Sequence, residues 1–109
     1  MPIPNYTPPA RRAYDIVIVG GAVVGSSTAY WLSQKLGDRA SVLVVERDST
    51  YEFSSTALST SAIRQQYSNP INVRISQFGI QFINSFAERM APFYPNEPAP
   101  DLGFREHGY

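Results

Sequence analysis

The chain has 109 residues, with nine Lys or Arg, nine Asp or Glu, zero formal net charge and no cysteine. The balanced charge gives no indication of a nucleic-acid or anionic-membrane partner. The lack of cysteine excludes a disulfide framework, a cysteine-ligated metal site and a cysteine-linked cofactor within this chain. We expect no metal site, and no segment approaches the ~18 consecutive apolar residues of a transmembrane helix.

Residues 1–13 form a proline-rich leader that we expect to be flexible. The leader lacks the apolar region of a secretory signal peptide, and we expect a cytoplasmic protein. Arg11 and Arg12, with no acid before Asp15, leave a mitochondrial presequence as the alternative. The prolines oppose the amphipathic helix that such a presequence forms.

A continuous apolar run, DIVIV, occupies residues 15–19. Such β-branched runs are typical of strands buried on both faces of a parallel sheet. The next residues align to the pattern G-x-G-x-x-G as Gly20, Ala22 and Gly25. Gly20 permits a tight turn, and Gly25 allows a helix to pack close to the sheet. Alanine replaces the middle glycine, which a negative φ at that position would accommodate beside the flexible Gly21.

We expect a helix from about Val23 to Leu36, capped at its C-terminal end by Gly37. Its sheet-facing side is predicted from residues at helical spacing, namely Gly25, Ala29, Leu32 and Leu36. The N-terminal end of this helix presents free N–H groups and the positive end of the helix dipole. A pyrophosphate suits that position.

A second apolar strand is expected at residues 41–45, and it ends at Glu46. A carboxylate at this point is placed to accept hydrogen bonds from both hydroxyls of an adenosine ribose. Strand, glycine turn, helix, strand and acid therefore predict a dinucleotide-binding βαβ unit of Rossmann type. The alternative is a plain βαβ unit with an accidental glycine turn.

The rest of the chain is less regular. Residues 47–50 read as a turn, and residues 54–66 are dense in hydroxyl groups. Asn69-Pro70 predicts the start of a helix that runs to about Met90. The apolar stripe on this helix predicts core packing, and consists of Ile71, Ile75, Phe78, Phe82 and Phe86. We expect an extended connection over the proline-rich residues 92–100, and a strand or hairpin beginning in residues 102–109.

Three segments, YDIVIVGGAVVGSSTAYWL, VLVVERD and STALSTSAIRQQYSNPINVRISQFG, resemble the N-terminal part of FAD-dependent oxidoreductases of the D-amino acid oxidase and sarcosine oxidase type. Within that family, the sequence is most similar to members of the sarcosine and dimethylglycine dehydrogenase kind. The resemblance implies FAD as cofactor and a small amine or amino acid as substrate. It implies oxidation of a C–N bond, with hydride transfer to the flavin.

The same resemblance implies which residues hold the cofactor. The turn would contact the pyrophosphate, Glu46 the ribose, Arg47 the adenosine, and the hydroxyl-rich stretch the phosphates and ribityl chain. Ile63 and Arg64 match a place close to the flavin ring, where a cation stabilises reduced flavin or attracts a substrate carboxylate. The full set of expected cofactor-binding residues is Gly20, Gly21, Ala22, Val23, Val24, Gly25, Glu46, Arg47, Ser54, Ser55, Thr56, Ile63 and Arg64.

Simpler interpretations stay open for several of these residues. The serines also fit a polar loop with capping hydroxyls, and Arg64 also fits a solvated arginine. His107 is the only histidine and is not expected to be catalytic. No catalytic residue is assigned, because the family supplies most substrate contacts from later segments.

Two alternatives to the whole interpretation remain, an NAD(P)-binding oxidoreductase and a non-catalytic nucleotide-binding protein. In the first, Arg47 would meet a 2′-phosphate, which Glu46 opposes. Because a single βαβ unit cannot form a doubly wound sheet, we expect residues 14–109 to be the incomplete N-terminal part of a larger α/β FAD-binding domain. On its own, the 109-residue chain is expected to be inactive.

Overall fold

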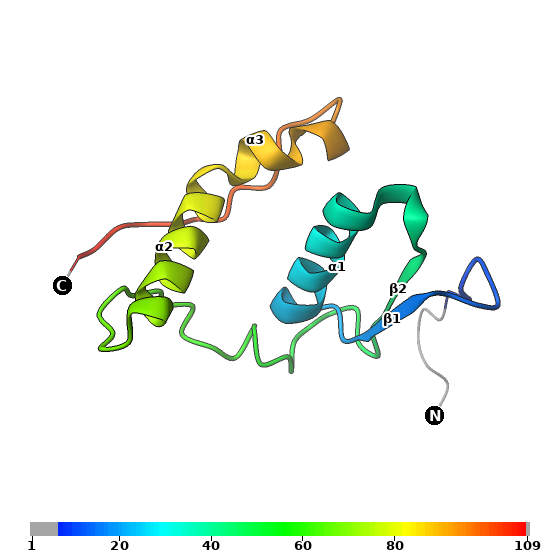
Figure 1. Cartoon of the computed structure of the whole chain (residues 1–109), viewed down its shortest axis with the longest axis horizontal. Coiled ribbons are helices and arrows are strands. Elements are labelled where there is room, and N and C mark those ends of the chain that lie inside the picture. Colours follow the sequence, from blue (N-terminus) through cyan, green and yellow to red (C-terminus); the bar gives the residue numbers. More distant parts are fainter. Residues whose placement is uncertain (1–6, 109) are drawn as a thin grey trace. The chain divides into compact units, whose positions relative to one another are not determined.

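The computed structural model describes residues 7–108, so the first part of the predicted leader, residues 1–6, lies outside the described residues. The chain divides into two units, one ending at Ser61 and the other beginning at Ala62. The first unit contains β1 (Ile16–Val19), α1 (Val23–Leu36), a short 3₁₀ helix η1 (Gly37–Arg39) and β2 (Val42–Val45). Figure 1 shows α1 between the two strands in chain order.

The first unit is the predicted βαβ arrangement. β1 and β2 pair in parallel, with Ile16 opposite Val42 and Val19 opposite Val45. Each strand is one residue shorter at its start than predicted. At both positions the backbone N–H bonds to a side chain of the opposite residue. The Asp15 N–H donates to Ser41 Oγ at 3.0 Å, and the Ser41 N–H donates to Asp15 Oδ2 at 2.7 Å.

The helix between the strands has the predicted bounds. Gly37 ends α1 with a φ of 53°, and its N–H donates to the Ser33 carbonyl oxygen, which confirms the predicted glycine cap. The predicted sheet-facing residues of α1 are all partly buried, and α1 contacts both strands. This side of the helix therefore covers one face of the sheet, as expected from the apolar spacing.

The prediction that the strands are buried on both faces is wrong for the described chain. Ile16 and Ile18 are partly buried, whereas Val17 is 53% exposed and Val19 is 87% exposed. Val44 and Val45 of β2 are also exposed. The alternation in β1 arises because a strand directs successive side chains to opposite faces, and α1 covers one face alone. β2 does not alternate, since its first two residues are partly buried and its last two are exposed.

The second unit contains α2 (Pro70–Asn84), α3 (Phe86–Met90) and the 3₁₀ helix η2 (Ala91–Phe93). Asn69 begins α2 as predicted, because its side-chain oxygen accepts a hydrogen bond of 3.1 Å from the Ile71 N–H. The single predicted helix to Met90 is instead broken at Ser85. At Ser85 the backbone leaves the helical conformation, with φ −100° and ψ 8°. The Ser85 N–H still donates to the Gln81 carbonyl oxygen at 3.1 Å, and the Ser85 hydroxyl donates to the same oxygen at 2.9 Å, a pattern that bends helices.

Two further expectations for the second unit are corrected. The apolar stripe is not a buried core. Ile71, Ile75 and Phe78 are 55%, 61% and 50% exposed. Phe82 and Phe86 are half-buried, with their rings in edge contact at 6.1 Å between centroids. Residues 102–108 form neither strand nor hairpin, and η2 interrupts the start of the predicted extended connection. None of the helices between residues 7 and 108 has the length and apolarity needed to cross a membrane.

Candidate functional site

The turn between β1 and α1 has the backbone geometry that its glycine predicts. Gly20 has a φ of 102°, a conformation that favours glycine strongly over other residues. Its N–H donates a 2.7 Å hydrogen bond to the carbonyl oxygen of Val45. The turn is therefore tied to the end of β2, at the edge of the sheet where β1 also ends.

Gly25 marks the close approach of helix and turn. A Cβ atom added there would overlap the Gly20 carbonyl oxygen, and would lie 2.9 Å from the Gly20 carbonyl carbon and 3.3 Å from Ile18 Cγ2. The expectation that this position must lack a side chain is confirmed. The small residue brings the first turn of α1 against the strand that precedes it.

Alanine at the middle glycine position fits without backbone strain. Ala22 is the N-cap of α1 and has a φ of −72°, which is the negative value that the sequence interpretation required. Val23 and Val24 follow as the first residues of α1 and are 60% and 77% exposed. The side chains at the N-terminal end of the helix are therefore exposed in the part of the chain that the structure describes.

Glu46 lies directly after β2, and its carboxylate reaches back to the turn. Oε2 accepts a 2.8 Å hydrogen bond from the Gly21 N–H, and Oε1 accepts a 2.9 Å bond from the Asp48 N–H. These backbone donors, Gly21 first and then Asp48, lower the pKa of Glu46 below its ordinary value. The acid is thus held ionised beside the turn, with lone pairs left for further donors.

One member of the hydroxyl-rich segment reaches α1. The Oγ1 atom of Thr56 accepts a 3.2 Å hydrogen bond from the N–H of Val23. Ser54 instead caps its own loop, because its Oγ accepts a 3.1 Å bond from the Ala57 N–H. Of the predicted hydroxyl positions, Thr56 lies at the glycine turn, while Ser55 is an exposed loop residue.

Sequence reasoning missed Tyr51. Its hydroxyl oxygen lies 2.9 Å from the point that a Cβ atom on Gly21 would occupy, so the phenol covers this buried glycine. The backbone of Tyr51 has a φ of 58°, which is uncommon for a bulky residue. The sequence shows an aromatic residue directly after the Asp48-Ser49-Thr50 turn, but this pattern does not specify where the side chain points.

The remaining predicted residues divide between the two units. Arg47 is exposed beside Glu46. Ile63 and Arg64 belong to the second unit, where they line a cavity of about 450 Å³ together with Arg105 and His107. Their expected place near a flavin ring stays a prediction.

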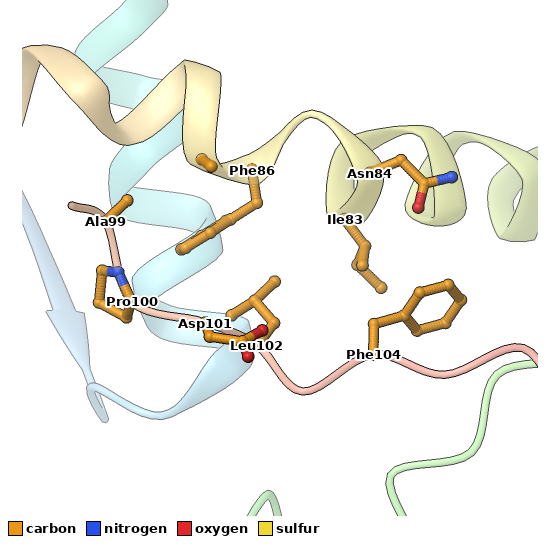
Figure 2. A pocket seen from close by; sticks show the side chains of 9 residues that line it. Ile83, Asn84, Phe86, Ala99, Pro100, Asp101, Leu102 and Phe104 are labelled. Carbon is orange, nitrogen blue, oxygen red and sulfur yellow. The ribbon is translucent and has the colours of Figure 1, made fainter.

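A second cavity of the same unit, of about 380 Å³, lies between the helices and the segment that follows them. Figure 2 shows Ile83 and Phe86 directed toward Leu102 and Phe104 across it. Its polar side chains are Asn84 and Asp101, which do not form an acid–base or nucleophile arrangement. Among residues 7–108, no group of His, Asp and Glu is arranged to hold a metal ion.

The turn fits a dinucleotide on its own geometry. Because Gly25 has no side chain, α1 can pack against the preceding strand as closely as such sites need. The positive end of the α1 dipole is a favourable place for an anion, although the Val23 N–H there is already bonded to Thr56 Oγ1. The carboxylate of Glu46 supplies the acceptor expected for ribose hydroxyls, although its contact with a ribose stays a prediction.

Comparison with known proteins identifies the family. Residues 15–109 match the family model described as FAD dependent oxidoreductase. The chain is 48% identical over 103 residues to the FAD-dependent oxidoreductase domain-containing protein 1 of Xenopus laevis, which covers 93% of this chain and 20% of that protein. It is 46% identical over 107 residues to the protein of the same name from Bos taurus, covering 96% of this chain and 21% of the relative.

A Drosophila melanogaster homologue of that protein is 40% identical over 95 residues, which cover 87% of this chain and 17% of the relative. The chain thus spans about a fifth of the length of the first two curated relatives that it matches. No solved structure matches it significantly.

Proposed function

The chain belongs to the family of FAD-dependent oxidoreductases, and we propose that the full-length protein oxidises a C–N bond of a small amino acid or N-methylated amine. Membership of this family implies FAD as the cofactor. The resemblance to sarcosine and dimethylglycine dehydrogenases supports the choice of substrate class. When bound, FAD supplies the acceptor for the hydride that leaves the substrate carbon.

The first unit would hold the adenosine half of the cofactor. The Glu46 carboxylate, fixed at 2.8 Å from the Gly21 N–H, is the observation that carries this assignment. This bond places an ionised acceptor beside the turn between β1 and α1. The positive φ of Gly20 and the missing side chain of Gly25 let the helix pack close to the strand there. The pyrophosphate would lie at the N-terminal end of α1, where Val23 and Val24 are exposed.

The flanking residues have lesser roles in the proposal. Thr56 orients the start of α1 by accepting the Val23 N–H, and Arg47 would lie along the adenosine. Arg64 would supply a positive charge near the flavin ring, where it stabilises negative charge on the reduced cofactor. The catalytic residues would come from parts of the full-length protein beyond this chain.

Two other functions remain as alternatives, and the experiment described below distinguishes them from the proposed one. An NAD(P)-dependent enzyme would use Arg47 for a 2′-phosphate, but the ionised Glu46 beside it repels that group. A non-catalytic nucleotide-binding protein would keep the turn and lack turnover. Family membership favours a flavin over a nicotinamide cofactor.

The experiment is purification of the full-length protein, followed by identification of the released cofactor by mass. We expect FAD, and we expect the flavin absorption to bleach anaerobically with sarcosine, dimethylglycine or a D-amino acid. Bound FAD that none of these amines reduces would contradict the C–N oxidation. A protein that binds NADP and no flavin would establish the nicotinamide alternative.

A further inference from the structure

Tyr51 occupies a position at the turn that the dinucleotide-binding motif does not require. It lies in the loop after β2, yet its hydroxyl oxygen comes within 2.9 Å of the site of a Cβ atom on Gly21. That same hypothetical Cβ atom lies 3.5 Å from Glu46 Cβ. Tyr51 and Glu46 therefore enclose Gly21, and both belong to the first unit.

The loop holds Tyr51 in an uncommon backbone conformation. Its φ is 58°, in the left-handed region that bulky residues rarely adopt. The Tyr51 N–H donates to the Asp48 carbonyl oxygen at 3.1 Å, and its own carbonyl oxygen accepts the Ser54 N–H at 2.9 Å. Thr50 is fixed in turn by its 2.6 Å hydroxyl bond to Asp48 Oδ1. Such a conformation costs free energy, and the hydrogen bonds of the loop maintain it beside the glycine turn.

The Tyr51 hydroxyl has no hydrogen-bond partner among residues 7–108, and the residue is 38% exposed. The Gly21 N–H, in contrast, is already bonded to Glu46 Oε2. At this point of the turn, the phenol O–H is therefore the available donor rather than the backbone N–H. Phosphate oxygens are charged acceptors, and hydrogen bonds to them are stronger than those between neutral groups.

We propose that Tyr51 is a positioning residue for the cofactor, and that its hydroxyl donates a hydrogen bond to the adenosine-side phosphate of FAD bound at the turn. The inference rests on the proposed function, since it requires FAD at this turn. It assigns the phosphate contact at Gly21 to a side chain that sits outside the glycine motif.

The test is the Tyr51→Phe variant of the full-length protein, which keeps the ring and removes the hydroxyl. FAD affinity of the apoprotein is measured by titration, and ADP and adenosine are measured as competitors. We expect FAD and ADP to bind about tenfold more weakly to the variant, and adenosine to bind as it does to the wild type. Tyr67→Phe, at a tyrosine of the second unit that is 44% exposed, is the matched control.

A second measurement tests the geometry independently of cofactor binding. Gly21→Ala and Tyr51→Phe should be coupled, because the new Cβ atom meets the Tyr51 hydroxyl. Removing the hydroxyl should therefore change the unfolding midpoint more favourably in the Gly21→Ala variant than in the wild type. Additive effects in the double variant would show that the hydroxyl does not lie over Gly21, and would overturn the inference.

The outcomes separate the inference from the proposed function. A wild-type protein that binds no FAD overturns both. If the Tyr51→Phe variant binds FAD as tightly as the wild type does, the role of Tyr51 is overturned and the proposed function is not. If Tyr51→Phe reduces the affinity for ADP and for adenosine equally, the hydroxyl contacts the nucleoside rather than the phosphate, and the inference is also overturned.

Discussion

The Glu46 carboxylate and the Gly21 N–H are joined by a 2.8 Å hydrogen bond that links the end of β2 to the turn after β1. The second carboxylate oxygen is bonded to Asp48, so the acid is oriented from two sides. An acceptor oriented before the ligand arrives binds more tightly, because less side-chain freedom is lost on binding. The backbone therefore orients this carboxylate before any ligand binds, as the proposed contact with a ribose would require.

Replacing Glu46 should weaken cofactor binding. Glu46→Gln keeps the shape of the side chain but removes the charge and exchanges one acceptor oxygen for a donor. We expect FAD to bind roughly tenfold more weakly to this variant in titrations of the apoprotein. Glu46→Ala should reduce the FAD affinity further, because it removes both acceptor oxygens. Glu52→Gln, an exposed glutamate of the same unit, is the control. Unchanged flavin content and affinity in both Glu46 variants would remove this residue from the site.

Enlarging Gly25 should be far more disruptive than restoring glycine at position 22. A Cβ atom at Gly25 overlaps the Gly20 carbonyl oxygen, which is backbone and has no room to move. We expect Gly25→Val to cost roughly 1–3 kcal/mol or more of folding stability, measured by chemical denaturation, and to reduce FAD content. Normal folding and FAD binding in this variant would show that the motif is aligned in the wrong frame.

Ala22→Gly is the paired substitution, and we expect it to be mild. With its φ of −72°, Ala22 occupies a conformation open to both residues, so glycine relieves no strain. Removing the methyl group increases the freedom of the unfolded chain and also opens the turn. Denaturation should show a small loss of stability, and titration should show unchanged or improved FAD affinity. A large loss of affinity would mean that the methyl group itself contacts the cofactor.

The contact between Asp15 and Ser41 should make stability depend on pH. The Ser41 N–H, followed by the Ser41 hydroxyl, lowers the pKa of Asp15 below its ordinary value of 3.8. Because the folded pKa is lower than the unfolded one, this stabilisation is present above pH 3.8 and is lost as the pH falls through the folded pKa. Asp15→Asn should therefore be less stable than the wild type at neutral pH and converge with it in acid. A difference in denaturation midpoint that persists in acid would exclude the charge as its source.

Local patterns predicted the parts of the fold that depend on neighbouring residues. The bounds of α1, its Gly37 cap and the Asn69 cap of α2 follow from helical spacing and capping chemistry, which act over a few residues. The close approach at Gly25 was also predictable, because the motif reflects a packing requirement. These features need no knowledge of the rest of the molecule.

Features that depend on distant contacts were not predictable. The position of the Tyr51 ring over Gly21 depends on the path of the loop after β2 and on a positive φ, neither of which has a pattern in the sequence. A local break also escaped prediction, because a serine inside a helical pattern does not by itself specify the change of backbone conformation at Ser85. The exposure of Val17 and Val19 depends on what covers the second face of the sheet, which periodicity cannot specify.

Residues 1–109 produced alone should fold poorly, associate and lack catalytic activity. No apolar side chain of residues 7–108 is buried, so the burial of apolar surface that stabilises a domain is small in the described chain. β1 and β2 form a two-stranded sheet with unpaired edges, and Val19 at the end of β1 is 87% exposed. Exposed apolar edges pair with other chains, and an isolated pair of strands is marginally stable in water. We expect a circular dichroism melt without a sharp transition, sedimentation that reveals oligomers, and FAD binding weaker than that of the full-length protein. A cooperative melt together with tight FAD binding would show instead that these residues form an independent domain.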